Sequence, residues 1–414
     1  MPDPADIFIL ARSGRALAQS ARACGWRPWV IDGFGDMDTR ACAAGVVKVR
    51  MSRDALSEAD VAAALEVLAR KASPGGAGSR PAPGTRLTSC RAGLIYGSGG
   101  EAMPGLLEGL ADRFEIIGNG AEVVRAVKDP RIFFATLTAL DIAYPATRFS
   151  TLEIKRRDGV RKLSQDADGA SAHEWLVKRA TGSGGDHVRC WRGGAIDNSQ
   201  RYFQQFLPGP AMSALFVADG RHARVLGYNT LWRARHARSS FAYGGAINRA
   251  KLSPSHRDLL KNHVRALTQV FGLRGLNSLD FVLHCGQPRV LEINPRPGAT
   301  CELYEPKART SMLAVHAKAC RGELPGDSLW RGLSQHGPRV QVIVYANRAY
   351  RVPQGMRWPN WCRDLPAPGA AISAHAPVCT VLAEGDDLEQ VSRLADARRV
   401  TVLNTMAKTT SLAA

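Results

Sequence analysis

The sequence lacks any apolar run long enough to span a bilayer, because charged residues interrupt every hydrophobic stretch. Its start, Met1 to Pro4, has no basic region before an apolar core, so we expect no signal peptide. The nine cysteines include no Cys-x-x-Cys pair, which favours reduced, mostly buried thiols over a zinc site. These absences together predict a cytoplasmic protein with no membrane partner.

Acidic residues are scarce relative to basic ones, with 37 Asp and Glu against 55 Lys and Arg and a net charge of +18. The basic residues are mostly scattered arginines, without the dense basic block and interleaved aromatics that a nucleic-acid groove needs. We therefore expect no nucleic-acid partner. The surplus positive charge suits small polyanions such as ATP and acidic substrates. An oligomer is compatible with the sequence.

The chain has 414 residues, too many for one compact core, which predicts two or three domains. Its start indicates a βαβ unit similar to half of a Rossmann-type fold: a strand at 7–11, a helix at 16–24 and a strand at 28–32. The turn at 12–15 lacks the G-x-G-x-x-G pattern, which argues against an NAD site. Further helices are expected at 57–71, 131–140 and 254–271, strands at 92–96, 279–284 and 289–293, loops at 73–86 and 156–172, and a strand-rich tail from 339, while residues 116–119 close the first domain.

The stretch 290–298 carries the strongest chemical pattern. Alternate residues of a strand face the same side, so Glu292 and Asn294 lie together on one face. If the residues 285–287 form a hairpin loop, Asp280 of the preceding strand lies directly across from Glu292. Two carboxylates and an amide oxygen suit a hard cation such as Mg²⁺. The alternative is a solvated strand end followed by a Pro-rich turn.

A second pattern places Lys178 on a predicted strand, before a Gly-rich loop. Such loops let backbone N–H groups approach phosphate closely, and the lysine supplies a point charge for the α- and β-phosphates. The loop residues are Gly182, Ser183, Gly184 and Gly185. The lysine precedes the glycines, so this is not a Walker A loop. A flexible surface hairpin is the alternative interpretation.

Two further segments are candidates for recognition. The backbone of Gln205, Phe206 and Leu207, before a Pro-Gly turn, could read an adenine edge, although an ordinary strand and turn would look the same. The segment 231–248 contains the candidate substrate residues Arg233, Arg235 and Tyr243. Its arginines suit an acidic substrate such as glutamate, and a solvated basic loop is the alternative.

In this order, the motifs resemble the ATP-grasp superfamily over residues 7–305. The resemblance implies two α+β subdomains that close on ATP, with Mg²⁺, or Mn²⁺ in its place, as the metal. The implied roles are metal binding for Asp280, Glu292 and Asn294, catalysis at the transferred phosphate for Arg296 with Asn294, phosphate binding for Lys178 and the glycine loop, and adenine binding for Gln204 to Leu207. Arg131 falls where the family often has the lysine of an Asp-Lys pair and would replace it. The family usually has Glu at position 204 and a ribose-binding Glu near 210–212, and this chain departs from both.

Residues 96–99, 118–119, 294–299 and 376–383 are similar to a branch of predicted carboligases that includes tyramine–glutamate ligase. We therefore expect an α/β and α+β architecture: a Rossmann-like domain (1–125), an ATP-grasp domain (126–325, with subdomains 145–207 and 208–325) and a strand-rich C-terminal domain (326–414). The expected activity is ligation of a carboxylate, such as glutamate, to an amine through an acyl phosphate, in cofactor biosynthesis. A carboxylase that uses carboxyphosphate and a non-catalytic nucleotide-binding protein are the alternatives.

Overall fold

The computed structural model describes residues 5–51, 55–72, 92–157, 175–193, 200–305, 311–335 and 337–410. The N-terminal part forms a sheet of five parallel strands in the order β3-β2-β1-β4-β5. Its elements are β1 (Asp6–Leu10), α1 (Arg15–Ala23), β2 (Arg27–Asp32), α2 (Met37–Cys42), β3 (Gly45–Lys48), α3 (Glu58–Ala72), β4 (Gly93–Tyr96), the 3₁₀ turn η1 (Gly100–Ala102), α4 (Pro104–Leu110) and β5 (Glu115–Ile116). The predicted loop at 73–86 lies outside the described residues.

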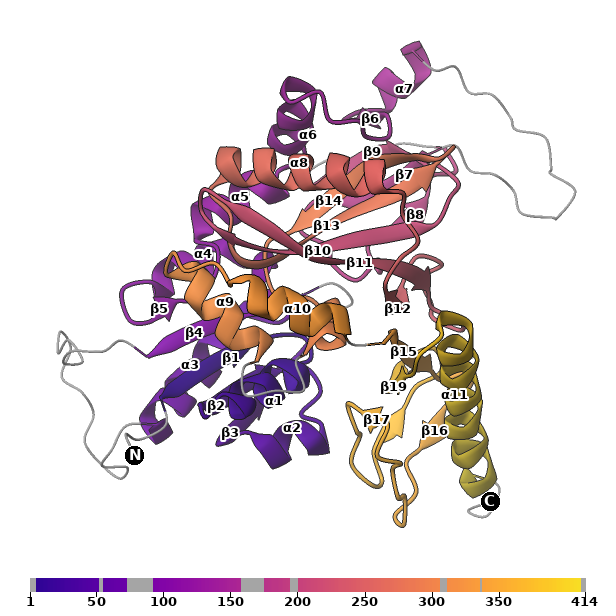
Figure 1. Cartoon of the computed structure of the whole chain (residues 1–414). Coiled ribbons are helices and arrows are strands. Elements are labelled where there is room, and N and C mark those ends of the chain that lie inside the picture. The colour runs from indigo at the N-terminus through magenta and orange to yellow at the C-terminus, as the bar shows by residue number, and fades with distance from the viewer. Residues whose placement is uncertain are drawn as a thin grey trace, which may run out of the picture.

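Apolar side chains cover both faces of this parallel sheet, as its topology requires. One face packs on α3 and α4 through a core that includes Leu65 and Leu107. The other face packs on α1 and on α9 (Met312–Cys320), whose Leu313 and Ala317 join the same cluster as Leu17. A helix from far along the chain therefore completes the N-terminal layer, as Figure 1 shows.

A second, smaller sheet has four antiparallel strands in the order β6-β9-β7-β8. Its strands are β6 (Thr147–Arg148), β7 (Trp175–Arg179), β8 (Arg189–Cys190) and β9 (Arg201–Gln205), and the helices before and beside it are α5 (Ala121–Lys128), α6 (Pro130–Ala139) and α7 (Thr151–Arg157). Asp129 caps α6 by accepting the backbone N–H groups of Arg131 and Ile132, and Pro130 occupies the first turn, so the helix begins where its sequence signals it. Most of the predicted loop at 156–172 lies outside the described residues.

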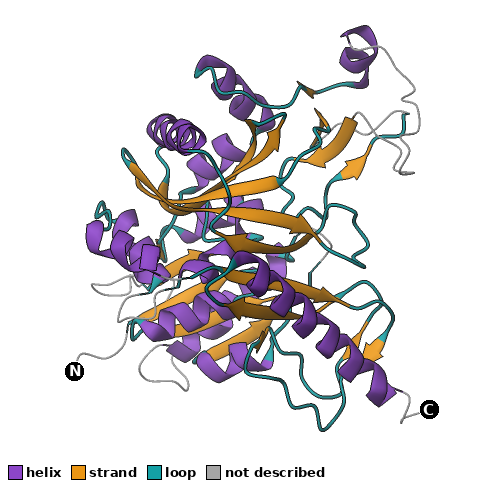
Figure 2. Cartoon of the chain, turned by 45° about the vertical axis from the view of Figure 1, so that its right-hand side comes forward, coloured by secondary structure: helices purple, strands orange, loops and turns teal. Residues whose placement is uncertain are grey.

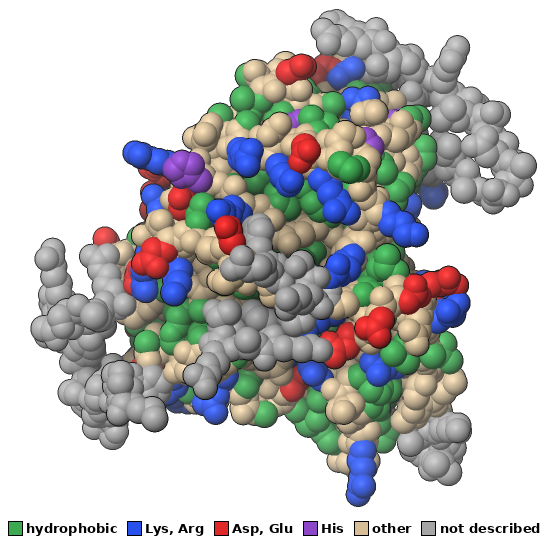
Figure 3. All heavy atoms as spheres, viewed as in Figure 1, with side chains coloured by type: hydrophobic (Ala, Val, Ile, Leu, Met, Phe, Trp, Pro, Cys, Tyr) green, Lys and Arg blue, Asp and Glu red, His purple; other side chains and the backbone are tan. Residues whose placement is uncertain are grey.

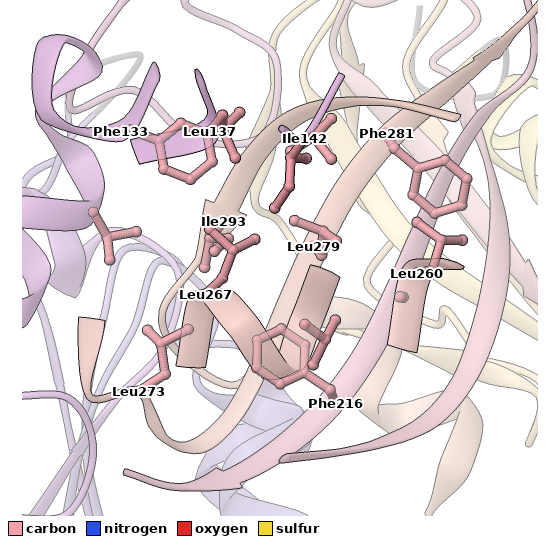
Figure 4. Packing of buried hydrophobic residues seen from close by; sticks show 14 of the residues in the cluster. Phe133, Leu137, Ile142, Phe216, Leu260, Leu267, Leu273, Leu279, Phe281 and Ile293 are labelled. Atoms are coloured by element: carbon pink, nitrogen blue, oxygen red, sulfur yellow. The ribbon is translucent and has the colours of Figure 1, made fainter. Parts of the chain in front are cut away.

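The third sheet has eight strands in the order β14-β13-β10-β11-β12-β15-β19-β17, and all neighbouring strands run antiparallel. Helix α8 (Pro254–Phe271) lies over one face (Figures 1 and 2). The strands are β10 (Ala211–Asp219), β11 (Ala223–Arg233), β12 (Tyr243–Asn248), β13 (Arg274–His284), β14 (Gln287–Asn294), β15 (Arg339–Tyr345), β17 (Cys362–Arg363) and β19 (Pro377–Glu384). Figure 4 shows Phe133 and Leu137 of α6 packing toward Leu279 and Ile293, so one core ties α6 and α8 to the sheet.

The C-terminal segment extends this third sheet, because β15 pairs with β12. It also holds a two-stranded ribbon and a helix that the sequence analysis did not predict, and the helix packs on β15 and β19 (Figure 1). The remaining elements are η2 (Ala299–Tyr304), α10 (Asp327–Gln335), β16 (Tyr350–Arg351), β18 (Ala371–Ile372) and α11 (Leu388–Thr410). The predicted mixed α/β and α+β fold class is confirmed, whereas the predicted domain boundaries stay a proposal.

The visible surface carries no single basic stripe. Lys and Arg side chains are spread over the face in Figure 3, with Asp and Glu between them. Within the described ranges, no helix is both long and apolar enough to cross a membrane.

Candidate active site

The β13–β14 hairpin brings the predicted carboxylates together. Asp280 is the cross-strand partner of Glu292, and Ser278 is the partner of Asn294. The predicted three-residue hairpin loop is one residue too long, because Gln287 already pairs with His284. A β-bulge next to Asp280 shifts the register by one residue and restores the predicted pairing.

Asn294 stands at the centre of a buried polar network. Its amide nitrogen donates to Asp280 Oδ2 at 3.0 Å, and its amide oxygen accepts from Arg296 at 3.2 Å. Arg296 is itself buried and forms an ion pair of 2.8 Å with Glu101 of the N-terminal layer. The network fixes the orientation of the amide and of the guanidinium, so both are preorganised beside the carboxylate pair.

The carboxylate pair titrates unevenly because its two members have different neighbours. Burial, followed by the charge of Glu292, raises the pKa of Asp280 to about 7. Burial opposes ionisation of Glu292 too, but the positive charges of Lys128, His187 and Lys178 lower the pKa of Glu292 to about 2. Glu292 is thus the resident anion, and Asp280 becomes charged near neutral pH.

Lys128 is the functional candidate that the sequence analysis missed. It ends α5, is buried, and its Nζ lies 3.4 Å from Glu292 Oε2. The structure places the predicted cation, Arg131, elsewhere: its guanidinium is exposed and lies over the ring of Phe149, 4.3 Å from the centroid. The sequence signal that could have identified Lys128 is the tripeptide Lys128-Asp129-Pro130, in which a cation directly precedes a helix cap.

Lys178 projects from β7 into the same region. The side chain is buried and its Nζ donates to Gln204 Oε1 at 2.6 Å. Burial lowers the pKa of Lys178, while the charges of Glu292 and Asp280 oppose that shift. Gln204 in turn donates to Thr147 Oγ1 at 3.4 Å, which orients the amide so that its oxygen faces the lysine. Gln204 therefore contacts Lys178, the candidate for phosphate binding, and also directly precedes the hinge residues.

The hinge after β9 keeps free donors. The N–H of Gln205 bonds the carbonyl of Ala146 at 2.8 Å, but those of Phe206 and Leu207 have no partner among the described residues. The ring of Phe206 meets that of Phe241 edge to face, and Arg233 lies 5.9 Å from its centroid. An apolar platform with unused N–H groups suits the edge of a flat heterocycle.

The glycine-rich loop lies between the N-terminal layer and the β11–β12 connection. Gly184 and Gly185 have φ of 66° and 77°, values that favour glycine. The Tyr243 N–H donates to the Gly184 carbonyl at 2.8 Å, and a Cβ on Gly185 would lie 1.9 Å from the Phe241 carbonyl oxygen. Ser183 is buried and accepts from Ser98 at 3.4 Å. Gly182, at the start of the loop, is just as tightly packed, since a Cβ on it would lie 2.0 Å from the ring of His187.

A cavity of about 900 Å³ opens beside the metal-site motif. Gly298 of the motif, Gly184 of the loop and Tyr243 all line it. Of the three predicted substrate residues, only Tyr243 lines the cavity, and its hydroxyl accepts from Gln341 at 2.6 Å. Arg233 and Arg235 are exposed and do not line it, and Arg233 lies at the hinge instead.

One buried ion cluster joins the three parts of the chain around this cavity. Arg15 of α1 pairs with Glu302 of η2 through both guanidinium nitrogens and donates to Asp364 at 3.1 Å. The guanidinium is 3% exposed, so both ion pairs are shielded from water. The cluster therefore fixes the C-terminal segment against the N-terminal layer.

The hairpin residues fit a divalent cation by donor chemistry. The described residues contain no group of three or more His, Cys, Asp or Glu side chains in a metal-binding arrangement. Asp280 and Glu292 supply two carboxylates and Asn294 an amide oxygen, while Glu292 keeps 32% of its side chain exposed. Three oxygen ligands leave positions for phosphate and water, which is the usual partial protein shell of Mg²⁺.

Comparisons with known proteins agree with this geometry. Residues 133–300 match the sequence profile of the ATP-grasp domain. Over 229 residues, the chain is 26% identical to the carbamoyl phosphate synthase large chain of Thermomicrobium roseum. That match covers 52% of this chain, and the chain spans about a fifth of that relative, 20%.

Solved structures show the same fold over nearly the whole chain. N5-carboxyaminoimidazole synthetase of Staphylococcus aureus is 16% identical with a TM-score of 0.62, covering 95% of this chain and 97% of the other. Carboxyaminoimidazole ribonucleotide synthase of Aspergillus clavatus, complexed with ATP, is 12% identical with a TM-score of 0.68, covering 98% and 100%. Biotin carboxylase of Campylobacter jejuni is 12% identical with a TM-score of 0.63, covering 93% and 88%.

Residues 133–300 therefore match the ATP-grasp domain, in agreement with the predicted resemblance, and nearly the whole chain shares the fold of these solved structures. The predicted enzyme class, an ATP-grasp ligase, agrees with the names of these relatives. The narrower resemblance to the carboligase branch with tyramine–glutamate ligase stays a prediction.

Proposed function

We propose that the protein is an ATP- and Mg²⁺-dependent carboxylate–amine ligase that works through an acyl phosphate. The observation that carries the proposal is the placement of two lysines against a cross-strand carboxylate pair, Lys128 beside Glu292 and Lys178 on the facing sheet. On an ATP-grasp fold, this is the charge pattern that a nucleotide phosphate chain and its cation require.

Catalysis of phosphoryl transfer requires mostly positioning of the reactants and neutralisation of charge, and different residues would supply each. Lys178 and Lys128 would face phosphate oxygens, and the hinge at Phe206 and Leu207 would hold the adenine edge. A cation bound by Glu292, Asp280 and Asn294 would neutralise charge on the nucleotide. Arg296, held by Glu101, would face the transferred group and directly precedes Pro297 and Gly298, which line the cavity.

The reaction requires no nucleophilic side chain. The substrate carboxylate attacks the γ-phosphorus, ADP leaves, and an amine then attacks the acyl carbon and displaces inorganic phosphate. The cavity beginning at Gly298 gives the substrates room directly beside the phosphate end of the site. Glutamate as the carboxylate, and a role in cofactor biosynthesis, are the narrower proposal and rest on the carboligase resemblance. Cytoplasmic location is proposed on the sequence evidence alone.

A carboxylase that uses carboxyphosphate is the second candidate. It is favoured by the similarity to solved structures named as a biotin carboxylase and as carboxyaminoimidazole synthetases. In that case bicarbonate takes the place of the organic carboxylate, and the same phosphate-binding residues serve both reactions.

Trapping of the acyl phosphate decides between these functions. The protein is incubated with ATP, Mg²⁺, hydroxylamine and a panel of carboxylates that begins with glutamate, and ADP and hydroxamate are measured. We expect a hydroxamate with at least one carboxylate. ADP that appears only with bicarbonate, and no hydroxamate, would replace the ligase by a carboxylase. If neither ADP nor hydroxamate forms, the protein binds nucleotide without catalysing a reaction.

A further inference from the structure

The far end of the cavity contains a buried carboxylate without a partner among the residues that the structure describes. Asp36 follows β2 and is 7% exposed, yet it lines the cavity. Its side chain makes no hydrogen bond or ion pair among the described residues, although it occupies the N-cap position of α2. A buried carboxylate without a donor is costly, so such a group calls for a partner from outside the chain.

The neighbouring carboxylates differ from Asp36, because each of them accepts hydrogen bonds from within the protein. Asp32 accepts three backbone N–H groups, from Gly14, Phe34 and Gly35 at 3.3, 3.1 and 2.6 Å. Asp38 accepts two, from Asp364 and Leu365, both at 2.9 Å.

Asp364 accepts from Ser13 at 3.0 Å and from Arg15 at 3.1 Å. Arg15 is the cation that acts on Asp36, but its guanidinium is already shared between Asp364 and Glu302. Four other cations line the cavity, Arg12, Arg40, Lys48 and Arg363, but none of them bonds to or pairs with Asp36 among the described residues.

The charges that act most strongly on Asp36 are therefore mostly negative. Burial, followed by the charges of Asp364, Asp32 and Asp38, raises the pKa of Asp36 to about 8. A cationic ligand group would relieve the repulsion and supply the missing donor in one contact.

The sheet order places this end away from the reacting groups. Gly97, which follows β4, lies next to the metal-site motif, since a Cβ there would be 3.8 Å from the Pro297 carbonyl oxygen. Strand β1 lies between β4 and β2, so two strand spacings, roughly 10 Å, separate the two ends. Apolar side chains, among them Leu17, Leu313 and Ile372, also line the cavity.

We propose that the substrate filling this cavity carries an ammonium group remote from its reacting end, and that Asp36 anchors it. The remainder of the substrate packs against the apolar lining. The identification of the ligand as a substrate rests on the ligase function proposed above, whereas the cation-binding site itself stands on the geometry around Asp36.

Calorimetric titration of the full chain with two isosteric probes, 1-hexylamine and 1-hexanol, tests the anchor near pH 8.5, where an alkylammonium stays charged. A charge-assisted contact in a buried site should make hexylamine bind about tenfold more tightly or better. Asp36→Asn keeps the shape and removes the charge, so the two probes should then bind within about twofold of each other. Asp112→Asn, an exposed position of the same domain, is the matched control and should keep the wild-type ratio.

Equal affinities of the wild type for the two probes, or a ratio that survives in Asp36→Asn, would overturn the proposal. If Asp36→Asn does not fold, Asp36→Ser replaces it, and the wild-type comparison stands by itself. The hydroxamate assay keeps the two proposals apart, because it measures the ligase chemistry, whereas the two probes measure binding of a cation at Asp36. Absence of hydroxamate from the wild type counts against the ligase function, not against the cation site.

Discussion

Replacement of Glu292 by Gln tests the cation site with the smallest change of shape. The amide keeps the volume of the side chain but removes its charge from between Lys128 and Asp280. We expect the variant to fold and to lose ADP formation.

The structure allows the effect on stability to be bounded. The pKa of Glu292 falls from 4.5 to about 2, so its ionisation stabilises the fold by at most about 3 kcal/mol, present above pH 4.5 and lost as pH falls toward 2. The side chain is 32% exposed, so solvent screening reduces this figure. In the opposite direction, removal of the charge relieves Asp280, whose raised pKa costs stability as pH rises from about 4 to about 7. The two effects offset each other, and we expect a net change within about 2 kcal/mol.

Activity should respond far more strongly than stability. Changes at or next to metal ligands typically cost about 10- to 100-fold, and the variant loses both a ligand and the partner of a lysine. We therefore expect ADP formation to fall by about 100-fold or more.

A coupled assay for ADP, together with thermal unfolding, measures both quantities. Glu389→Gln on α11 is the control, because that side chain is 77% exposed. If Glu292→Gln is folded and keeps ADP formation within about twofold of wild type at saturating Mg²⁺, the assignment of the cation site is refuted.

Two other predictions address the nucleotide and its pH dependence. Lys178→Ala should weaken ATP binding in calorimetry by about tenfold or more, since a charge-assisted contact is lost, while Lys261→Ala on the exposed face of α8 should not. An unchanged dissociation constant for Lys178→Ala would remove the lysine from the phosphate site. The affinity for Mg²⁺·ATP should rise with pH through about 7, because Asp280 must lose its proton to bind a cation and its pKa is raised to about 7. A flat affinity between about pH 6 and pH 8 would contradict that role.

Local pattern in the sequence was enough to place several site residues. Glu292 and Asn294 share a face because strand alternation depends only on neighbours in sequence. The pairing of Asp280 with Glu292 followed from a short hairpin, although the loop is one residue shorter than expected and a bulge makes up the difference. Helix α8 occupies the predicted 254–271 because its amphipathic pattern and its Ser253 cap are local signals.

Local sequence patterns could not predict contacts between residues that are far apart in the chain. Lys128 meets Glu292 across 164 positions of sequence, so its local signal, a cation directly before a helix cap, could not show that it faces this carboxylate. The placement of Arg233 at the hinge and of Tyr243 on the cavity wall likewise depends on how β11 and β12 lie in the large sheet.

The sequence by itself determined several of the helices and strands, the carboxylate hairpin and the lysine strand, because each follows from the periodicity and capping of a short segment. Only the tertiary structure decided which cation faces Glu292, that the C-terminal strands extend the large sheet, and that Asp36 lines a cavity without a partner among the described residues. The physical reason is that charge balance and burial are properties of the space around a side chain. That space is built by segments hundreds of residues apart, such as Arg15, Glu302 and Asp364.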